Sequence, residues 1–107
     1  MNLPGDIRLA VELGVVSDII TPQVANHVLW WLRHDLGYEP GPFTLALLQT
    51  VRYADPNNRG KLRAAFPGYV LALDLYDGAS SMTDGIERLQ LLAGHKITYT
   101  NGQRSVE

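Results

Sequence analysis

Cysteine is absent from the 107 residues of this chain. Without cysteine the protein has no disulfide framework, no thiolate nucleophile and no cysteine-ligated zinc site. Long apolar runs are absent too, and the longest is much too short to cross a bilayer. The first residues also lack the basic and apolar regions of a signal peptide. We therefore expect a soluble, cytoplasmic protein with no membrane partner.

A large excess of charge of one sign is also missing, because the formal net charge is only −2. A nearly neutral chain has no global attraction for nucleic acid or anionic lipid. The cations are nevertheless unevenly placed, and four of the nine lie between positions 52 and 63. Every charged residue between positions 64 and 87 is acidic: Asp74, Asp77, Asp84 and Glu87. The pattern predicts helices in series with a charge gradient, and the ordinary interpretation is a set of solvated helix faces.

The sequence also lacks recognisable catalytic and metal-binding motifs. His27 and His34 are seven positions apart, too far along a helix to share one metal ion. Asp74 and Asp77 are one helical turn apart, but a solvated helix face explains them better than acid–base chemistry. No serine lies in the sharp turn that exposes a nucleophile. We expect no enzyme activity, no cofactor and no metal.

Apolar residues make up 46% of the chain, enough for a core, and their spacing is helical between regularly placed Gly and Pro residues. The sequence therefore predicts an all-α fold, a compact bundle of five or six short helices. The helical domain covers residues 1–94, and residues 95–107 form a peripheral tail. In that tail Asn101-Gly102 is typical of a two-residue hairpin turn. A lone hairpin is marginal in water, so we expect a docked edge or a mobile segment.

Helix starts carry the clearest local signals. Thr21 and Asp55 are good N-cap residues, and each precedes a proline, which suits the first helical position. Gly residues after apolar runs indicate helix ends. The predicted helices are Gly5–Leu13, 22–36 ended by Gly37, 42–54 starting at Pro42 or Phe43, 56–66, Pro67–Asp77 ended by Gly78, and a last one opened by an Asp84/Glu87 capping box and ended by Gly94.

Helical periodicity also predicts the core. Its expected members are Leu29, Leu32, Leu36, Phe43, Leu47, Val51, Leu62, Phe66, Leu73, Leu89 and Leu92. Replacement of Phe66 by Ala is predicted to cost about 3–5 kcal/mol, as for a buried aromatic residue.

The second helix carries the candidate binding surface. At 100° per residue, Trp30 points away from the apolar stripe, together with His27, Arg33 and His34. An exposed tryptophan among polar neighbours is typical of an interaction hot spot. The alternative is that a neighbouring helix or the tail covers Trp30. Trp31, nearer the stripe, is expected to stabilise the fold instead.

A basic strip gives the second candidate site. Arg52, Arg59, Lys61 and Arg63 are placed to contact phosphates, and Asn58 lies in the first turn of its helix, where base or backbone contacts are made. Four cations without interleaved aromatic residues give a small electrostatic contribution, however. DNA binding through this strip is therefore the alternative rather than the preferred function.

The run ADPNNRGKLRAAFPGYV, with FTLALLQTVRYA before it, resembles small uncharacterised proteins of actinobacteria and their phages. The resemblance covers about Phe43 to Leu73, and its motif is structural, so it assigns no site residues. It implies a phage or prophage accessory factor. The expected function is a small non-enzymatic module that binds a host or phage protein; the alternatives are a DNA-binding protein and a structural homo-oligomer.

Overall fold

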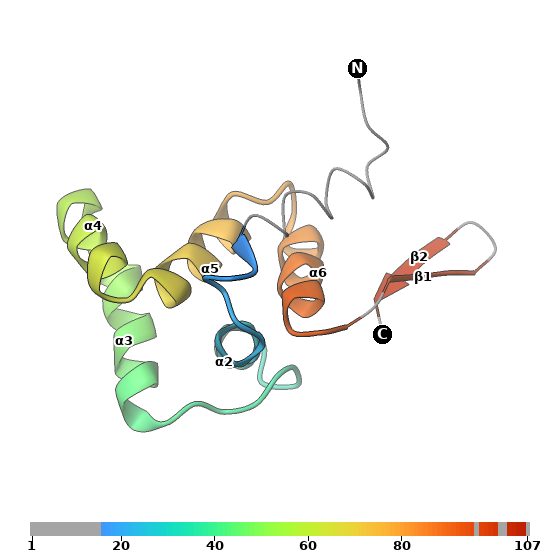
Figure 1. Cartoon of the computed structure of the whole chain (residues 1–107), viewed down its shortest axis with the longest axis horizontal. Coiled ribbons are helices and arrows are strands. Elements are labelled where there is room, and N and C mark those ends of the chain that lie inside the picture. Colours follow the sequence, from blue (N-terminus) through green and yellow to red (C-terminus); the bar gives the residue numbers. More distant parts are fainter. Residues whose placement is uncertain (1–15, 96, 101–102, 107) are drawn as a thin grey trace, which may run out of the picture.

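The computed structural model describes residues 16–95, 97–100 and 103–106, and in this part of the chain it shows a bundle of short helices followed by a hairpin (Figure 1). The predicted all-α fold class is confirmed. The predicted helix Gly5–Leu13 and the turn residues Asn101-Gly102 lie outside the described residues. The elements are α2 (Pro22–Leu32), α3 (Pro42–Tyr53), α4 (Pro56–Ala65), α5 (Pro67–Asp77), α6 (Met82–Leu92), β1 (Ile97–Thr100) and β2 (Gln103–Val106).

Proline and a capping side chain set the helix starts, as predicted. The Thr21 hydroxyl accepts a hydrogen bond from the Val24 backbone N–H at 3.3 Å at the start of α2. The Asp55 carboxylate accepts one from the Asn58 backbone N–H at 2.8 Å at the start of α4. These bonds pair backbone donors that have no partner within the helix. Helix α5 runs from Pro67 to Asp77 with Gly78 after it, as the sequence predicts.

Two helix boundaries differ from the prediction by more than one residue. Helix α2 ends at Leu32 rather than at Leu36, because the chain then turns back along α2. The turn places Gly37 at φ 58°, a left-handed conformation that favours glycine, and the Tyr38 N–H donates to the Asn26 carbonyl at 3.4 Å. Helix α6 starts at Met82, earlier than predicted, because the Ser81 hydroxyl caps it by accepting from the Asp84 N–H at 3.0 Å.

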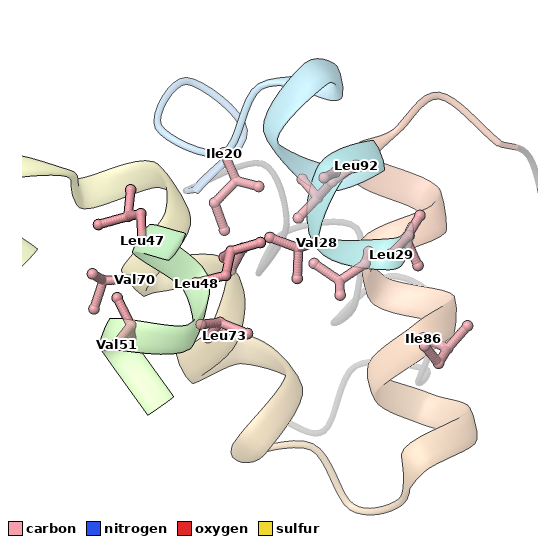
Figure 2. Packing of buried hydrophobic residues seen from close by; sticks show 13 residues of the cluster. Ile20, Val28, Leu29, Leu47, Leu48, Val51, Val70, Leu73, Ile86 and Leu92 are labelled. Atoms are coloured by element: carbon pink, nitrogen blue, oxygen red, sulfur yellow. The ribbon is translucent and has the colours of Figure 1, made fainter. Parts of the chain in front are cut away.

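Helix α5 is the centre of the bundle and contacts α2, α3, α4 and α6. Helix α2 also packs against α6 and α3, so these helices enclose one apolar core (Figure 2). Leu48 of α3, Val28 of α2 and Leu73 of α5 have no exposed surface and meet near its middle. The other buried apolar residues are Ile20, Ala25, Leu29, Leu47, Val51, Val70, Ala72, Ile86, Leu89 and Leu92.

Most of the predicted core is confirmed, but Phe43 is wrong. Its side chain is 67% exposed, because the inner face of α3 is formed by Leu47, Leu48 and Val51 instead. Four other predicted members are half-buried residues packed against the core: Leu32, Leu36, Leu62 and Phe66. Because Phe66 is only half-buried, we now expect its replacement by Ala to cost about 1–3 kcal/mol, less than for a fully buried aromatic residue.

The tail forms the predicted hairpin. Strands β1 and β2 pair antiparallel, with Thr100 opposite Gln103 and Ile97 opposite Val106. This register leaves a two-residue connection between the strands, as the sequence indicates. The hairpin lies beside the C-terminal end of α6 and projects away from the bundle (Figure 1).

Candidate functional site

The predicted surface on α2 is partly assembled. The Trp30 ring stacks on the His34 ring with 4.2 Å between centroids and 11° between planes. Arg33 lies beside them and pairs with Asp35 at 2.8 Å on the exposed surface. Trp30 is nevertheless half-buried, and the His34 ring stacked on it covers part of the indole. The structure therefore brings Trp30, Arg33 and His34 together, with less free indole surface than the sequence suggests.

His27 does not belong to this surface, which corrects the prediction. Only 8% of the residue is exposed. Its Nδ1 lies 2.8 Å from the hydroxyl of Tyr69 on α5, and its ring meets the edge of the Tyr38 ring at 5.3 Å between centroids. Burial removes water from the charged imidazolium and lowers the pKa of His27 below its ordinary value of 6.5. His27 therefore joins α2 to α5 and is not available to a partner.

Trp31 takes the structural position that the sequence assigns to it. It packs against the hydrophobic core, and the Arg52 guanidinium lies 5.6 Å from the centroid of its ring. The same guanidinium lies 6.0 Å from the ring centroid of Tyr76 on α5. These distances are within the range of cation–π attraction. Arg52 thus links α3 to α2 and α5.

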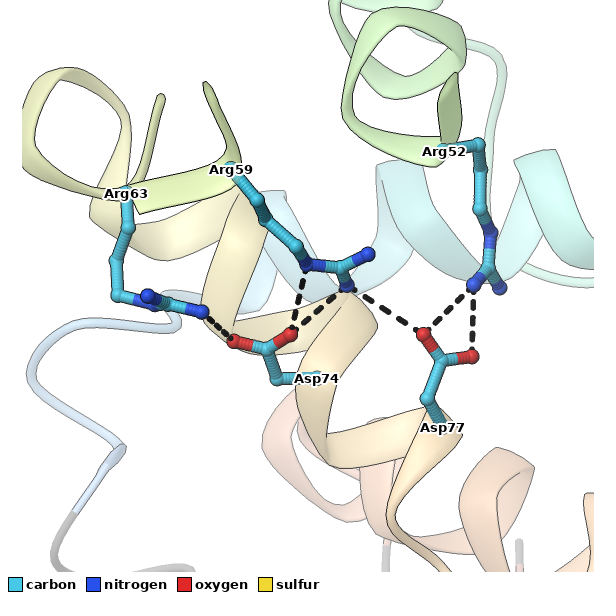
Figure 3. Close-up of polar contacts among 5 residues, drawn as sticks. All are labelled: Arg52, Arg59, Arg63, Asp74 and Asp77. Atoms are coloured by element: carbon cyan, nitrogen blue, oxygen red, sulfur yellow. Dashed lines mark hydrogen bonds and ion pairs between the residues drawn. The ribbon is translucent and has the colours of Figure 1, made fainter. Parts of the chain in front are cut away.

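The basic strip is neutralised within the chain (Figure 3). Asp74 of α5 pairs with Arg59 at 2.8 Å and with Arg63 at 2.9 Å, both from α4. Asp77, one turn further along α5, pairs with Arg52 of α3 at 2.7 Å and with Arg59 at 3.4 Å. Arg59 joins the two carboxylates, and only 20% of its side chain is exposed. Two of the four acidic residues of the sequence gradient, Asp74 and Asp77, therefore pair with three of the four cations of the basic strip.

This network corrects the prediction of a free phosphate-binding strip. Arg52, Arg59 and Arg63 already have carboxylate partners, so a phosphate would compete with Asp74 or Asp77 for them. Asn58 is also engaged, because its backbone and side-chain N–H groups both donate to Asp55. Of the predicted strip, Lys61 alone forms no ion pair with any residue that the structure describes. Of the four cations in this strip, only Lys61 therefore lacks a carboxylate partner among the described residues.

A feature that the sequence analysis missed lies between α3 and α4. An open groove of about 410 Å³ is lined by Thr50, Tyr53, Ala54, Asn58, Lys61 and Leu62. We call it the α3–α4 groove. Tyr53 is 80% exposed at its edge, and Phe43, at the opposite end of α3, contacts Phe66 at 5.8 Å between ring centroids. Its volume lies within the range of about 300–1,000 Å³ typical of ligand sites.

Helix α3 carries large aromatic side chains outside its buried face, and these are the signal that the sequence analysis passed over. The buried face, with Leu47, Leu48 and Val51, enters the core. Tyr53, at the C-terminal end of α3, lines the groove beside Thr50, whereas Phe43 lies at the opposite end of the helix. An exposed aromatic residue at a concave surface is typical of a site that another molecule covers.

Other kinds of site find no support in the described ranges. Within them no three His, Asp or Glu side chains gather as metal ligands. Over the same ranges no helix has both the length and the apolar character that a membrane span requires. The chain matches no protein-family model, and no curated protein or solved structure matches it. The resemblance of Phe43 to Leu73 to small actinobacterial and phage proteins therefore stays a prediction.

Proposed function

We propose that this chain is a small non-enzymatic module that binds another protein through the α3–α4 groove. The observation that carries the proposal is Tyr53, which is 80% exposed and lines an open groove; Phe43, 67% exposed, lies at the other end of the same helix. Large exposed apolar side chains around a concavity are typical of protein interaction sites. Tyrosine in particular often carries binding energy at such sites.

The partner class follows from the sequence-based expectation. A host or phage protein in the cytoplasm is the proposed partner, in keeping with a phage or prophage accessory factor. The Trp30–His34 stack on α2 remains the sequence-based alternative for the binding surface, with Arg33 beside it. A homo-oligomer is the second alternative. DNA binding has lost its main support, because the arginines of the basic strip are paired with Asp74 and Asp77.

Affinity capture with matched variants tests which surface is used. We would compare wild-type protein, Tyr53→Ser and Trp30→Ala for the amount of the same protein captured from host lysate, and then measure binding of that purified protein by calorimetry. Tyr53 is exposed, so its replacement should change the free energy of unfolding by less than about 0.5 kcal/mol. We expect Tyr53→Ser to weaken binding by about 2 kcal/mol or more.

Two results would reject the proposal. Binding that survives Tyr53→Ser and is lost in Trp30→Ala would move the site to α2. Micromolar binding to random duplex DNA at near-physiological salt, falling steeply as salt is added, would favour the nucleic-acid alternative.

A further inference from the structure

The polar lining of the α3–α4 groove has one sign of charge. Lys61 is its only charged lining residue, and the other polar contributions come from Thr50, Asn58 and the Tyr53 hydroxyl. The nearest acid along α4, Asp55, already accepts two hydrogen bonds from Asn58. No described carboxylate forms an ion pair with Lys61. An occupant that supplies a carboxylate beside its apolar contacts would therefore complete the charge pattern of the groove.

The shape of the groove favours a helix as occupant. Its walls are two antiparallel helices, because α3 and α4 are joined at one end through Ala54-Asp55 and meet at the other through the Phe43–Phe66 contact. Leu62 and Ala54 give apolar surface inside it, while Tyr53 and Lys61 carry its polar groups. A helix laid in such a groove is held by apolar anchors spaced i, i+4 and i+7, with polar groups at its flanks.

A second copy of this chain fits less well. In a two-fold symmetric contact through the same groove, each copy would present the same lining to the other. That lining contains Lys61 and no carboxylate, so neither copy would offer a partner for the other's Lys61. Two cationic patches that face each other disfavour the contact.

We propose that the α3–α4 groove binds a short amphipathic helix of a partner protein, with two apolar anchors near Leu62 and Tyr53 and an acidic residue paired with Lys61. This inference rests on the proposed function and adds the chemical class of the segment that is bound. The acidic residue selects among amphipathic helices, and the apolar anchors supply most of the affinity.

The test is a selection from a display library of random peptides of about 16 residues, long enough for about 24 Å of helix. The full chain is the bait. We expect the enriched peptides to carry apolar residues at i and i+4 together with Asp or Glu. Lys61→Glu should weaken a selected peptide by about tenfold, and a peptide with its acid changed to Lys should regain binding to this variant. Thr83→Glu adds a negative charge at an exposed position of α6 and should leave binding unchanged.

The outcomes separate the inference from the proposed function. The inference would be overturned by peptides that no longer bind the Tyr53→Ser variant but contain no Asp or Glu, or that bind the Lys61→Glu variant as well as wild type. In either case the groove would remain a binding site. Peptides insensitive to Tyr53→Ser, or no enrichment over an empty support, would overturn both. A wild-type dimer that Tyr53→Ser converts to a monomer in sedimentation experiments would make a second copy the occupant instead.

Discussion

Among the glycines that the structure describes, Gly37 leaves the least room for a side chain. The residue has φ 58°, and a Cβ built on it lies 2.0 Å from the carbonyl oxygen of Asn26 on α2. Alanine in the left-handed region costs about 1–2 kcal/mol. The turn must also move away from α2, which removes the hydrogen bond from the Tyr38 N–H to Asn26, worth about 0.5–1.5 kcal/mol. We therefore expect Gly37→Ala to lower the free energy of unfolding by about 1.5–3.5 kcal/mol.

Gly60 supplies a control, because alanine at this position is expected to raise stability rather than lower it. It lies inside α4 with helical neighbours on both sides, and a Cβ there meets no atom within 4 Å. Alanine is a better helix former than glycine, so Gly60→Ala should raise the free energy of unfolding by about 0.5–1 kcal/mol. Urea unfolding followed by far-ultraviolet circular dichroism measures both variants on the same scale. A Gly37→Ala variant as stable as wild type would refute the turn geometry described above.

Two further predictions concern α2. Burial lowers the pKa of His27 in the folded chain, so as pH falls below about 6.5 the unfolded chain binds a proton at His27 before the folded chain does. The free energy of unfolding should therefore decrease with falling pH in this range and level off below the folded pKa. Urea titrations at several pH values should show a smaller decrease for His27→Asn than for wild type. Trp31→Ala should lower the free energy of unfolding by about 2–4 kcal/mol, because the indole packs on the core beside Arg52. Trp30→Ala should lower it by about 1 kcal/mol at most. Equal losses of stability of the two variants in thermal melts would contradict the assigned orientations.

Local signals in the sequence were enough to predict most helix starts. The Thr21-Pro22 and Asp55-Pro56 pairs act within one turn of the chain, so their effect does not depend on the rest of the fold. The end of α2 was predicted less well, because Leu36 continues the apolar period although the chain has already turned. A periodic apolar residue in a turn that packs against the core looks the same, in the sequence, as one in the helix.

The candidate site was predicted less well, since it depends on contacts between distant segments. The sequence shows that Arg59 and Asp74 are charged, but only the packing of α4 on α5 makes them a pair. Phe43 was assigned to the core because it lies on the same apolar stripe as Leu47 and Val51, and periodicity does not show that the core ends before the first turn of α3. His27 is on the outer half of α2 by helical geometry, and Tyr69 from α5 is what buries it.

Helix α4 has no buried residue, although it forms one wall of the α3–α4 groove. It is held by the arginine–aspartate pairs to α5 and by the half-buried Leu62 against the core, and partly exposed charge pairs contribute less free energy than full apolar burial does. Segments with little apolar burial open at a lower free energy than the whole domain, so backbone amides of α4 should exchange with deuterium faster than those of α5. We therefore expect α4 to be the more mobile wall of the groove, so that the width of the groove adjusts to the helix that it binds. Binding should then slow exchange along α4.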